Sequence, residues 1–188
     1  SIHAIFLILG LITVASVILI SLYLIFAGLP AISKIGLKEF LFGSEWASTR
    51  EDPKFGILPF ILTSVYGTSG AIVIGVPIGF FTAVYLAKEA RPAVKRVTIS
   101  AVNLLAGIPS VVYGLVGMLV LVPAIRKAFG IPDGAGLLAA ILVLTVMILP
   151  SIIKVSLTSL EAVPKEYEDG SLALGASPTE TYFRISVP

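Results

Sequence analysis

The sequence is 188 residues long, 57% hydrophobic and 13% charged. Its charge content is about half that of ordinary soluble domains, so the composition excludes a soluble domain. The formal net charge of +2 is too small for a nucleic-acid-binding surface, and without cysteine the chain has no disulfide or thiol chemistry. Four stretches lack charged residues and histidine, and each is long enough for the roughly 20 residues of a membrane-spanning helix. They cover residues 4–33, 55–87, 97–125 and 134–153. We expect an all-α, multi-pass membrane protein with one transmembrane domain over residues 1–188.

The first membrane helix is predicted over about residues 2–28, because Gly28-Leu29-Pro30 is a typical helix stop. The polar segment 30–54 follows, and we predict that it is periplasmic with a short aromatic helix at the membrane surface. The chain opens almost directly on an apolar run at Ser1 and stops at Pro188 inside an apparent helix. This pattern indicates truncation at both ends.

The second membrane helix is predicted over residues 55–87, and small residues recur along it at every fourth position. Such a stripe lets membrane helices approach closely, so helix packing is the favoured interpretation. The alternative is a stripe that lines a pathway, with the hydroxyls of Thr63, Ser64, Thr68 and Ser69 as contacts. The small residues are Thr63, Gly67, Ala71, Gly75, Gly79, Ala83 and Ala87.

The connection over residues 88–96 carries four Lys and Arg side chains, which favours the cytoplasmic side. The third membrane helix is predicted over residues 97–122, with Pro109 in the middle of an uncharged run. Pro109 either makes a packing kink or, together with Gly107, breaks the helix so that a freed N-terminus faces an anion pathway. The pathway candidates in this helix are Asn103, Gly107, Pro109, Ser110 and Tyr113.

The fourth membrane helix is predicted over residues 134–155, and residues 156–177 form a cytoplasmic coupling region. Within that region, Lys165 to Leu174 read as a short helix that Gly175 ends. Ser177-Pro178-Thr179-Glu180 then matches a capping box, so another helix begins at residue 178. A compact helix–turn–helix results, which either transmits force from a soluble motor or lies on the membrane surface without a partner.

The run Asp169 to Ser177, followed by Ile185 to Pro188, resembles the cytoplasmic EAA loop of bacterial ABC importer permeases. It departs from that motif at its opening, where Asp169, Gly170 and Ser171 stand in place of Glu, Ala and Ala. The stretch Leu104 to Pro123 is similar to the membrane subunit of the phosphate ABC importer, the C-type permease of a heterodimeric pair. The resemblance implies a type I importer permease of six helices, truncated here, in a bacterial or archaeal inner membrane. It implies ATPase docking by Glu166, Tyr167, Glu168, Asp169, Gly170, Ser171, Leu172, Ala173, Leu174, Gly175 and Ala176.

The resemblance also implies alternating access for inorganic phosphate, with ATP and Mg on a separate ATPase and no catalytic or metal-binding residue in this chain. The implied partners are that ATPase, a second homologous permease subunit, a periplasmic phosphate-binding protein and membrane lipid. An intramembrane Arg and Glu for phosphate are expected beyond Pro188. Two alternatives stay open, because the EAA loop does not encode the substrate. One is a permease for molybdate or sulfate, and the other is a channel or scaffold without an ATPase.

Overall fold

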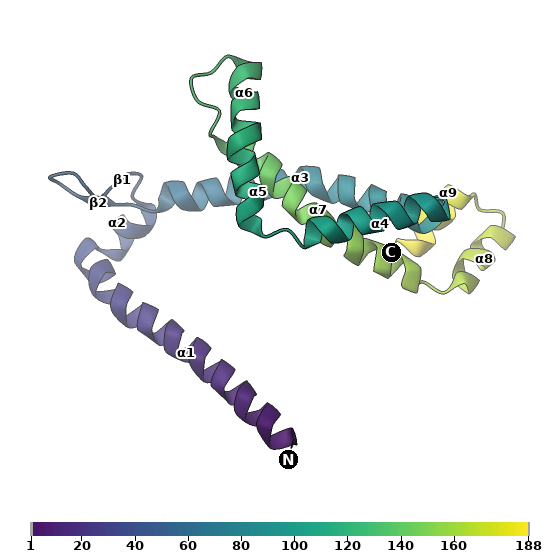
Figure 1. Cartoon of the computed structure of the whole chain (residues 1–188), viewed down its shortest axis with the longest axis horizontal. Coiled ribbons are helices and arrows are strands. Elements are labelled where there is room, and N and C mark those ends of the chain that lie inside the picture. The colour runs from purple at the N-terminus through teal and green to yellow at the C-terminus, as the bar shows by residue number, and fades with distance from the viewer. Residues whose placement is uncertain (1, 188) are drawn as a thin grey trace. The chain divides into compact units, whose positions relative to one another are not determined.

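The computed structural model describes residues 2–187 and divides the chain into two compact units, Ser1–Leu62 and Thr63–Pro188. Nearly all regular structure is helical, so the predicted all-α class is confirmed (Figure 1). Within the described residues, four helical segments are long and apolar enough to cross a membrane. They are Ile2–Ile35, Leu58–Lys88, Ser110–Phe129 and Leu137–Ala162.

In the first unit, helix α1 spans Ile2–Ile35 and so continues beyond the predicted end at residue 28. Pro30 is accommodated inside the helix, where its carbonyl accepts a hydrogen bond from the Ser33 hydroxyl at 2.9 Å. The helix ends instead before Gly36, whose φ of 90° leaves the helical region. The predicted end at residue 28 is therefore wrong, and α1 is longer by seven residues.

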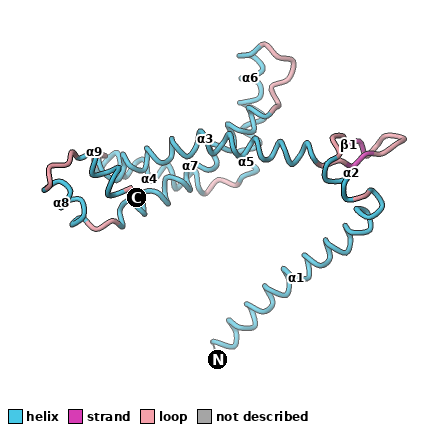
Figure 2. The backbone as a smooth tube through the Cα atoms, turned by 180° about the vertical axis from the view of Figure 1, so that it is seen from behind, coloured by secondary structure: helices cyan, strands magenta, loops and turns pink. Residues whose placement is uncertain are grey.

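The first unit also contains a short hairpin that the sequence did not predict. Helix α2 spans Leu37–Phe42, and strands β1 (Trp46–Ala47) and β2 (Lys54–Phe55) pair antiparallel. Figure 2 shows the strand segment in magenta, at the label β1. The Trp46 ring meets the rings of Phe55 and Phe60 edge to face, each at 5.6 Å between centroids. These aromatic contacts hold the two-residue ladder, which is too short to be stable alone.

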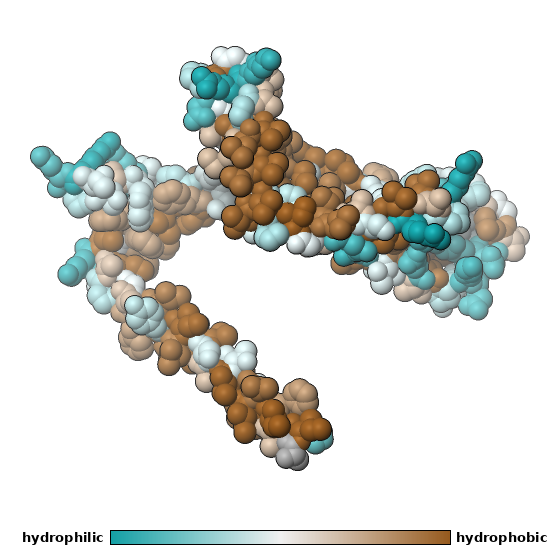
Figure 3. Space-filling view, in the orientation of Figure 1, coloured by the Kyte–Doolittle hydropathy of each residue, from teal (hydrophilic) through white to brown (hydrophobic). Residues whose placement is uncertain are grey.

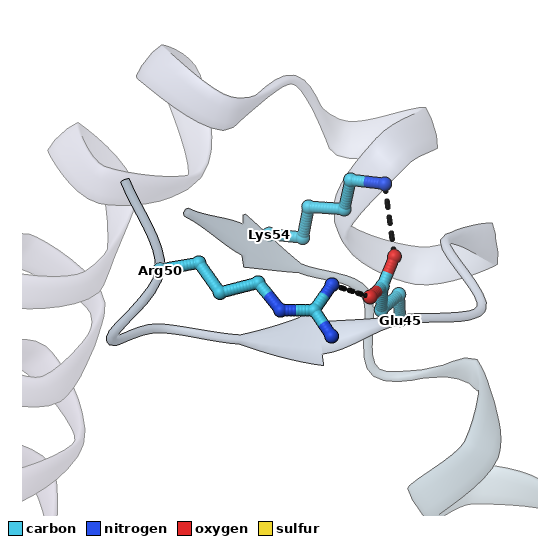
Figure 4. A network of polar contacts seen from close by, with 3 residues as sticks. All are labelled: Glu45, Arg50 and Lys54. Carbon is cyan, nitrogen blue, oxygen red and sulfur yellow. Dashed lines mark hydrogen bonds and ion pairs between the residues drawn. The ribbon is translucent and has the colours of Figure 1, made fainter. Parts of the chain in front are cut away.

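A carboxylate on the same hairpin gathers two cations (Figure 4). Glu45 accepts hydrogen bonds from Arg50 and, at 2.8 Å, from Lys54. The Lys54 hydrogen bond, with the Arg50 charge second, holds the pKa of Glu45 below its usual range. All three side chains lie at the surface, so this network orders the loop and contributes little to stability.

In the second unit, the small residues of α3 (Leu58–Lys88) let it lie close to α7 (Leu137–Ala162). A Cβ added at Gly79 would lie 2.7 Å from Cγ2 of Ile152, which is closer than van der Waals contact allows. The packing interpretation of the stripe is thus confirmed where the two helices face each other. The buried members of the stripe are Gly67, Ala71, Gly75, Gly79 and Ala83.

The predicted third helix over 97–122 was wrong as a single element. Helix α4 begins earlier and spans Pro92–Ala106, because Pro92 suits the first helical turn. The helix then breaks at Gly107 and Pro109. The backbone of Pro109 is extended, with a φ of −58° and a ψ of 141°. A second helical segment follows, and it is long and apolar enough to cross a membrane as one span. It comprises α5 (Ser110–Val116), the π-helical turn η1 (Gly117–Leu121) and α6 (Val122–Phe129).

The early start of α4 also shortens the predicted basic connection over 88–96. Lys88 ends α3, and Lys95 and Arg96 already belong to α4, so only Glu89 to Arg91 connect the two helices. The fourth predicted helix, 134–155, shifts in the other direction. Helix α7 continues to Ala162, so residues 156–162 belong to this helix and the predicted coupling region begins later, at residue 163.

The core of the second unit lies where α3, α4 and α7 converge beside the short helices α8 (Lys165–Ala173) and α9 (Pro178–Thr181). The π-helical turn η2 (Tyr182–Ser186) continues α9. Figure 3 shows hydrophilic residues at this end and around the loop after α6, with hydrophobic helices between. The core side chains are Ala83, Val84, Leu86, Val102, Ile153, Leu157 and Leu160.

Candidate functional site

The helix–turn–helix predicted after α7 is present, with α8 and α9 joined by a tight turn. Val163 and Pro164 are extended and separate α8 from α7. At the other end of α8, the Ala176 N–H donates to the Ser171 carbonyl at 3.2 Å and the Gly175 N–H to that of Leu172 at 3.0 Å. This pair of bonds is a Schellman motif, and the φ of 88° at Gly175 is the left-handed conformation that the motif requires. The predicted glycine stop is confirmed.

The capping box is also confirmed. The Ser177 hydroxyl accepts from the Glu180 N–H at 3.3 Å, and the Glu180 carboxylate accepts from the Ser177 N–H at 3.0 Å. Pro178 occupies the first helical turn, where no N–H is needed. The Ser177 N–H and hydroxyl both lower the pKa of Glu180. The start of a helix at residue 178 is therefore fixed by local chemistry.

One carboxylate of α8 faces inward and ties the hairpin to the membrane helices. Glu168 accepts hydrogen bonds from the Lys88 ammonium at the end of α3 and, at 2.8 Å, from the Ser186 hydroxyl of η2. The Lys88 Nζ also lies 5.9 Å from the centroid of the Tyr182 ring. We call Lys88, Glu168 and Ser186 the Glu168 anchor.

A second inward contact joins α8 directly to α9. The hydroxyls of Ser171 and Thr181 lie 2.9 Å apart, and Thr181 is only 1% exposed. In a hairpin that was only loosely attached, both hydroxyls would be exposed to solvent. The two contacts together hold α8 and α9 as one body against the core.

The outer face of α8 carries Tyr167, which is 64% exposed, and ends at Leu174, the capping residue directly after the helix, which is 91% exposed. Leu172, between them in the chain, is 44% exposed. Large apolar side chains this exposed outside the membrane spans indicate a protein interface. The structure thus divides the predicted docking residues into two groups. Glu168, Ser171 and Ala176 are partly buried, and the exposed members are Glu166, Tyr167, Asp169, Gly170, Leu172, Ala173, Leu174 and Gly175.

The pathway candidates are spread over three helices. Thr63 and Thr68 are exposed on α3, Asn103 on α4, and Ser110 at the start of α5. Tyr113 has a structural role, because its hydroxyl donates to the Leu105 carbonyl at 2.8 Å across the break. Of the two interpretations of Pro109, the break is confirmed. The anion pathway stays a prediction for Asn103, Gly107, Pro109, Ser110, Tyr113, Thr63 and Thr68.

Sequence reasoning missed the partners that hold α8 in place, namely Lys88, Thr181 and Ser186. Lys88 and Glu168 are separated by 80 positions in the chain, so no local spacing signals their contact. Lys88 was noted only as part of a basic connection. Among residues 2–187, the structure gathers no three histidine, aspartate or glutamate residues that could hold a metal ion.

Acidification should loosen the hairpin through Glu168. The Lys88 ammonium lowers the pKa of Glu168 from its ordinary value of 4.5, against partial burial and with help from Ser186. A carboxyl whose pKa is depressed by folding stabilises the fold above its unfolded pKa, and the contribution is lost as the pH falls through the folded pKa. We expect the wild type to lose more thermal stability than Glu168→Gln between about pH 5 and about pH 3. Unfolding midpoints in one detergent measure this, and equal acid sensitivity would contradict it. Glu45 and Glu180 titrate in both proteins and cancel.

Together, the spans and the hairpin define a polytopic helical membrane protein that presents a rigid helix–turn–helix outside the bilayer. The chain belongs to the family of binding-protein-dependent transport system inner membrane components, which matches residues 75–188. This family and the four spans make it a multi-pass inner membrane protein.

Several curated proteins are similar to this chain. The probable ABC transporter permease protein YqgH of Bacillus subtilis (strain 168) is 39% identical over 181 residues, which are 95% of this chain and 59% of the relative. The phosphate transport system permease protein PstC of Mesorhizobium japonicum is 32% identical over 87% of this chain and 55% of its own length. PstA 1 of Mycobacterium tuberculosis, also a phosphate transport system permease protein, is 32% identical over 71% of this chain and 45% of its own length. The chain therefore spans about half the length of these relatives. No solved structure matches it significantly.

Proposed function

We propose that this chain is part of the transmembrane subunit of an ATP-driven importer that moves inorganic phosphate by alternating access. The observation that carries the proposal is the outer face of α8, where Leu174 is 91% exposed on a helix whose other side is tied to the membrane helices. A separate ATPase docks on this face, and its movement reaches the spans through α8. ATP and Mg belong to that ATPase.

Phosphate is favoured by the relatives, since two of the three described above are named phosphate transport system permease proteins. The name of YqgH gives no substrate. The remaining proposed partners are a second homologous permease subunit, which pairs with this one as a heterodimer, a periplasmic phosphate-binding protein and membrane lipid. Asn103 and Ser110 are the proposed polar contacts of the pathway.

Docking on the outer face is tested in the full-length protein, expressed with its candidate ATPase and second permease. We expect Leu174→Asp to reduce the ATPase recovered with the permease by roughly tenfold, because a buried apolar contact is replaced by a charge. Leu37→Asp is the matched control, an exposed leucine on α2 that we expect to leave recovery unchanged. Equal recovery of ATPase with both variants would contradict docking on α8.

The substrate is tested separately, by uptake of labelled phosphate into vesicles that contain the complete importer. We expect unlabelled phosphate to compete, and molybdate and sulfate to leave uptake unchanged. Competition by molybdate or sulfate alone would assign another oxyanion. Uptake that continues without ATP would instead support a channel.

A further inference from the structure

Two neighbouring acids on α8 lie on different faces of the helix. Asp169, which stands at the Glu position of the EAA motif, is exposed. Glu168 is turned toward the membrane helices, and its side chain is only 18% exposed. Successive residues of a helix are about 100° apart around its axis, so one acid reaches a partner outside while the other is held inside. The inward acid is the one that the motif does not identify.

Glu168 joins three elements through a single carboxylate oxygen. Its Oε1 accepts from the Lys88 Nζ of α3 and from the Ser186 Oγ of η2, while its backbone belongs to α8. Ser186 is buried, and the Lys88 side chain is 11% exposed. The anchor therefore lies at the junction where the hairpin meets the spans.

The residues behind the anchor make it a stiff connection. Leu86, two positions before Lys88, is 1% exposed and belongs to the core shared with α4 and α7. Lys88 therefore ends a helix whose last turn is packed against α4 and α7. Interiors packed to this degree transmit strain rather than absorb it.

A second ion pair in the same unit offers a comparison. Nζ of Lys95 on α4 and Oε1 of Glu161 on α7 are 2.5 Å apart, but their side chains are 31% and 47% exposed, and the pair joins α4 to α7. Exposed pairs contribute little, whereas removing one partner of a shielded pair leaves the other charge uncompensated. Of these two ion pairs, the Lys88–Glu168 pair is the one that combines shielding with a connection to α8.

We propose that Glu168 is a positioning residue that couples α8 to α3, so that movement of the docked ATPase reaches the spans through the Glu168–Lys88 pair. This inference rests on the proposed function, because it needs a motor on the outer face of α8. Glu168 itself touches neither phosphate nor ATP. The Glu168 side chain keeps α8 and the end of α3 in a fixed relative position, so that the two helices move together.

The test uses the complete importer in proteoliposomes and measures phosphate taken up per ATP hydrolysed. We expect Glu168→Gln to assemble and hydrolyse ATP but to lower this ratio by about tenfold, since an uncharged amide no longer balances the Lys88 ammonium. Lys88→Arg keeps the charge and the hydrogen-bonding donors, and should retain most of the ratio. Glu161→Gln is the matched control and should leave the ratio at the wild-type value. An unchanged ratio in Glu168→Gln, or an equal loss in Glu161→Gln, overturns the proposal.

A distance measurement reports the anchor independently of transport. This chain has no cysteine, so once any cysteines elsewhere in the importer are replaced, spin labels can be placed specifically at Lys165→Cys on α8 and Thr158→Cys on α7. We expect a single narrow distance distribution in the otherwise wild-type importer and a broader one after Glu168→Gln. An unchanged distribution overturns the proposal even if uptake falls. Failure of the proposed function is distinguishable, because the wild-type chain would then recruit no ATPase at all.

Discussion

Gly175→Ala should uncouple the hairpin, whereas Gly170→Ala, five positions earlier, should strengthen it. Gly175 has a φ of 88°, a conformation that costs an alanine about 1–2 kcal/mol. Gly170 lies inside α8 with no atom within 4 Å of an added Cβ. Alanine there gains up to about 1 kcal/mol in helix propensity and restores the residue usual in the EAA motif.

Both variants are made in the full-length protein, and both add the same single methyl group. The measurements are the thermal unfolding midpoint and the amount of ATPase recovered with the permease. We expect both to fall for Gly175→Ala, because α9 then leaves α8 in a different direction and the Ser171–Thr181 contact opens. Equal midpoints for the two variants would show that the left-handed turn does not hold the hairpin.

Gly79→Ala should destabilise the membrane bundle, and Gly67→Ala should not. A Cβ at Gly79 would lie 2.7 Å from Cγ2 and 3.0 Å from Cβ of Ile152, atoms too near the α7 backbone to move aside. A Cβ at Gly67 would lie 3.7 Å from the nearest atom, in ordinary contact with Leu137. Overpacking of this kind costs about 1–3 kcal/mol, so α3 and α7 must separate in the first variant only.

Thermal unfolding of the two purified proteins in one detergent, followed by circular dichroism, measures the difference. The pair is well matched, because both glycines are buried in α3 on the same stripe. A Gly79→Ala protein as stable as Gly67→Ala would mean that the helices do not approach as closely as the structure indicates.

Local signals predicted the site better than they predicted the membrane helices. The turn at Gly175 and the Ser177–Glu180 capping box depend on hydrogen bonds between residues close together in the chain, so both could be predicted from sequence alone. Helix ends inside long apolar runs have no such chemistry nearby. Gly28 and Pro30 are typical of a helix stop, yet α1 continues through both to Ile35.

Charged residues near helix ends were also predicted in the wrong element. Lys95 and Glu161 read as connection and coupling region, but they lie on α4 and α7 and pair with each other. The Glu168 anchor could not be predicted, since Lys88 and Glu168 meet only after three helices have packed. The sequence therefore predicts what a segment does by itself, and the structure adds what holds it in place.

The aromatic cluster of the hairpin in the first unit determines which part of this chain tryptophan fluorescence reports on. Trp46 is the only tryptophan in the chain, and its ring packs edge to face on Phe55 and Phe60. Its emission follows the surroundings of strands β1 and β2. Within this chain, tryptophan emission therefore reports on that hairpin, and movements of α8 need a label of their own.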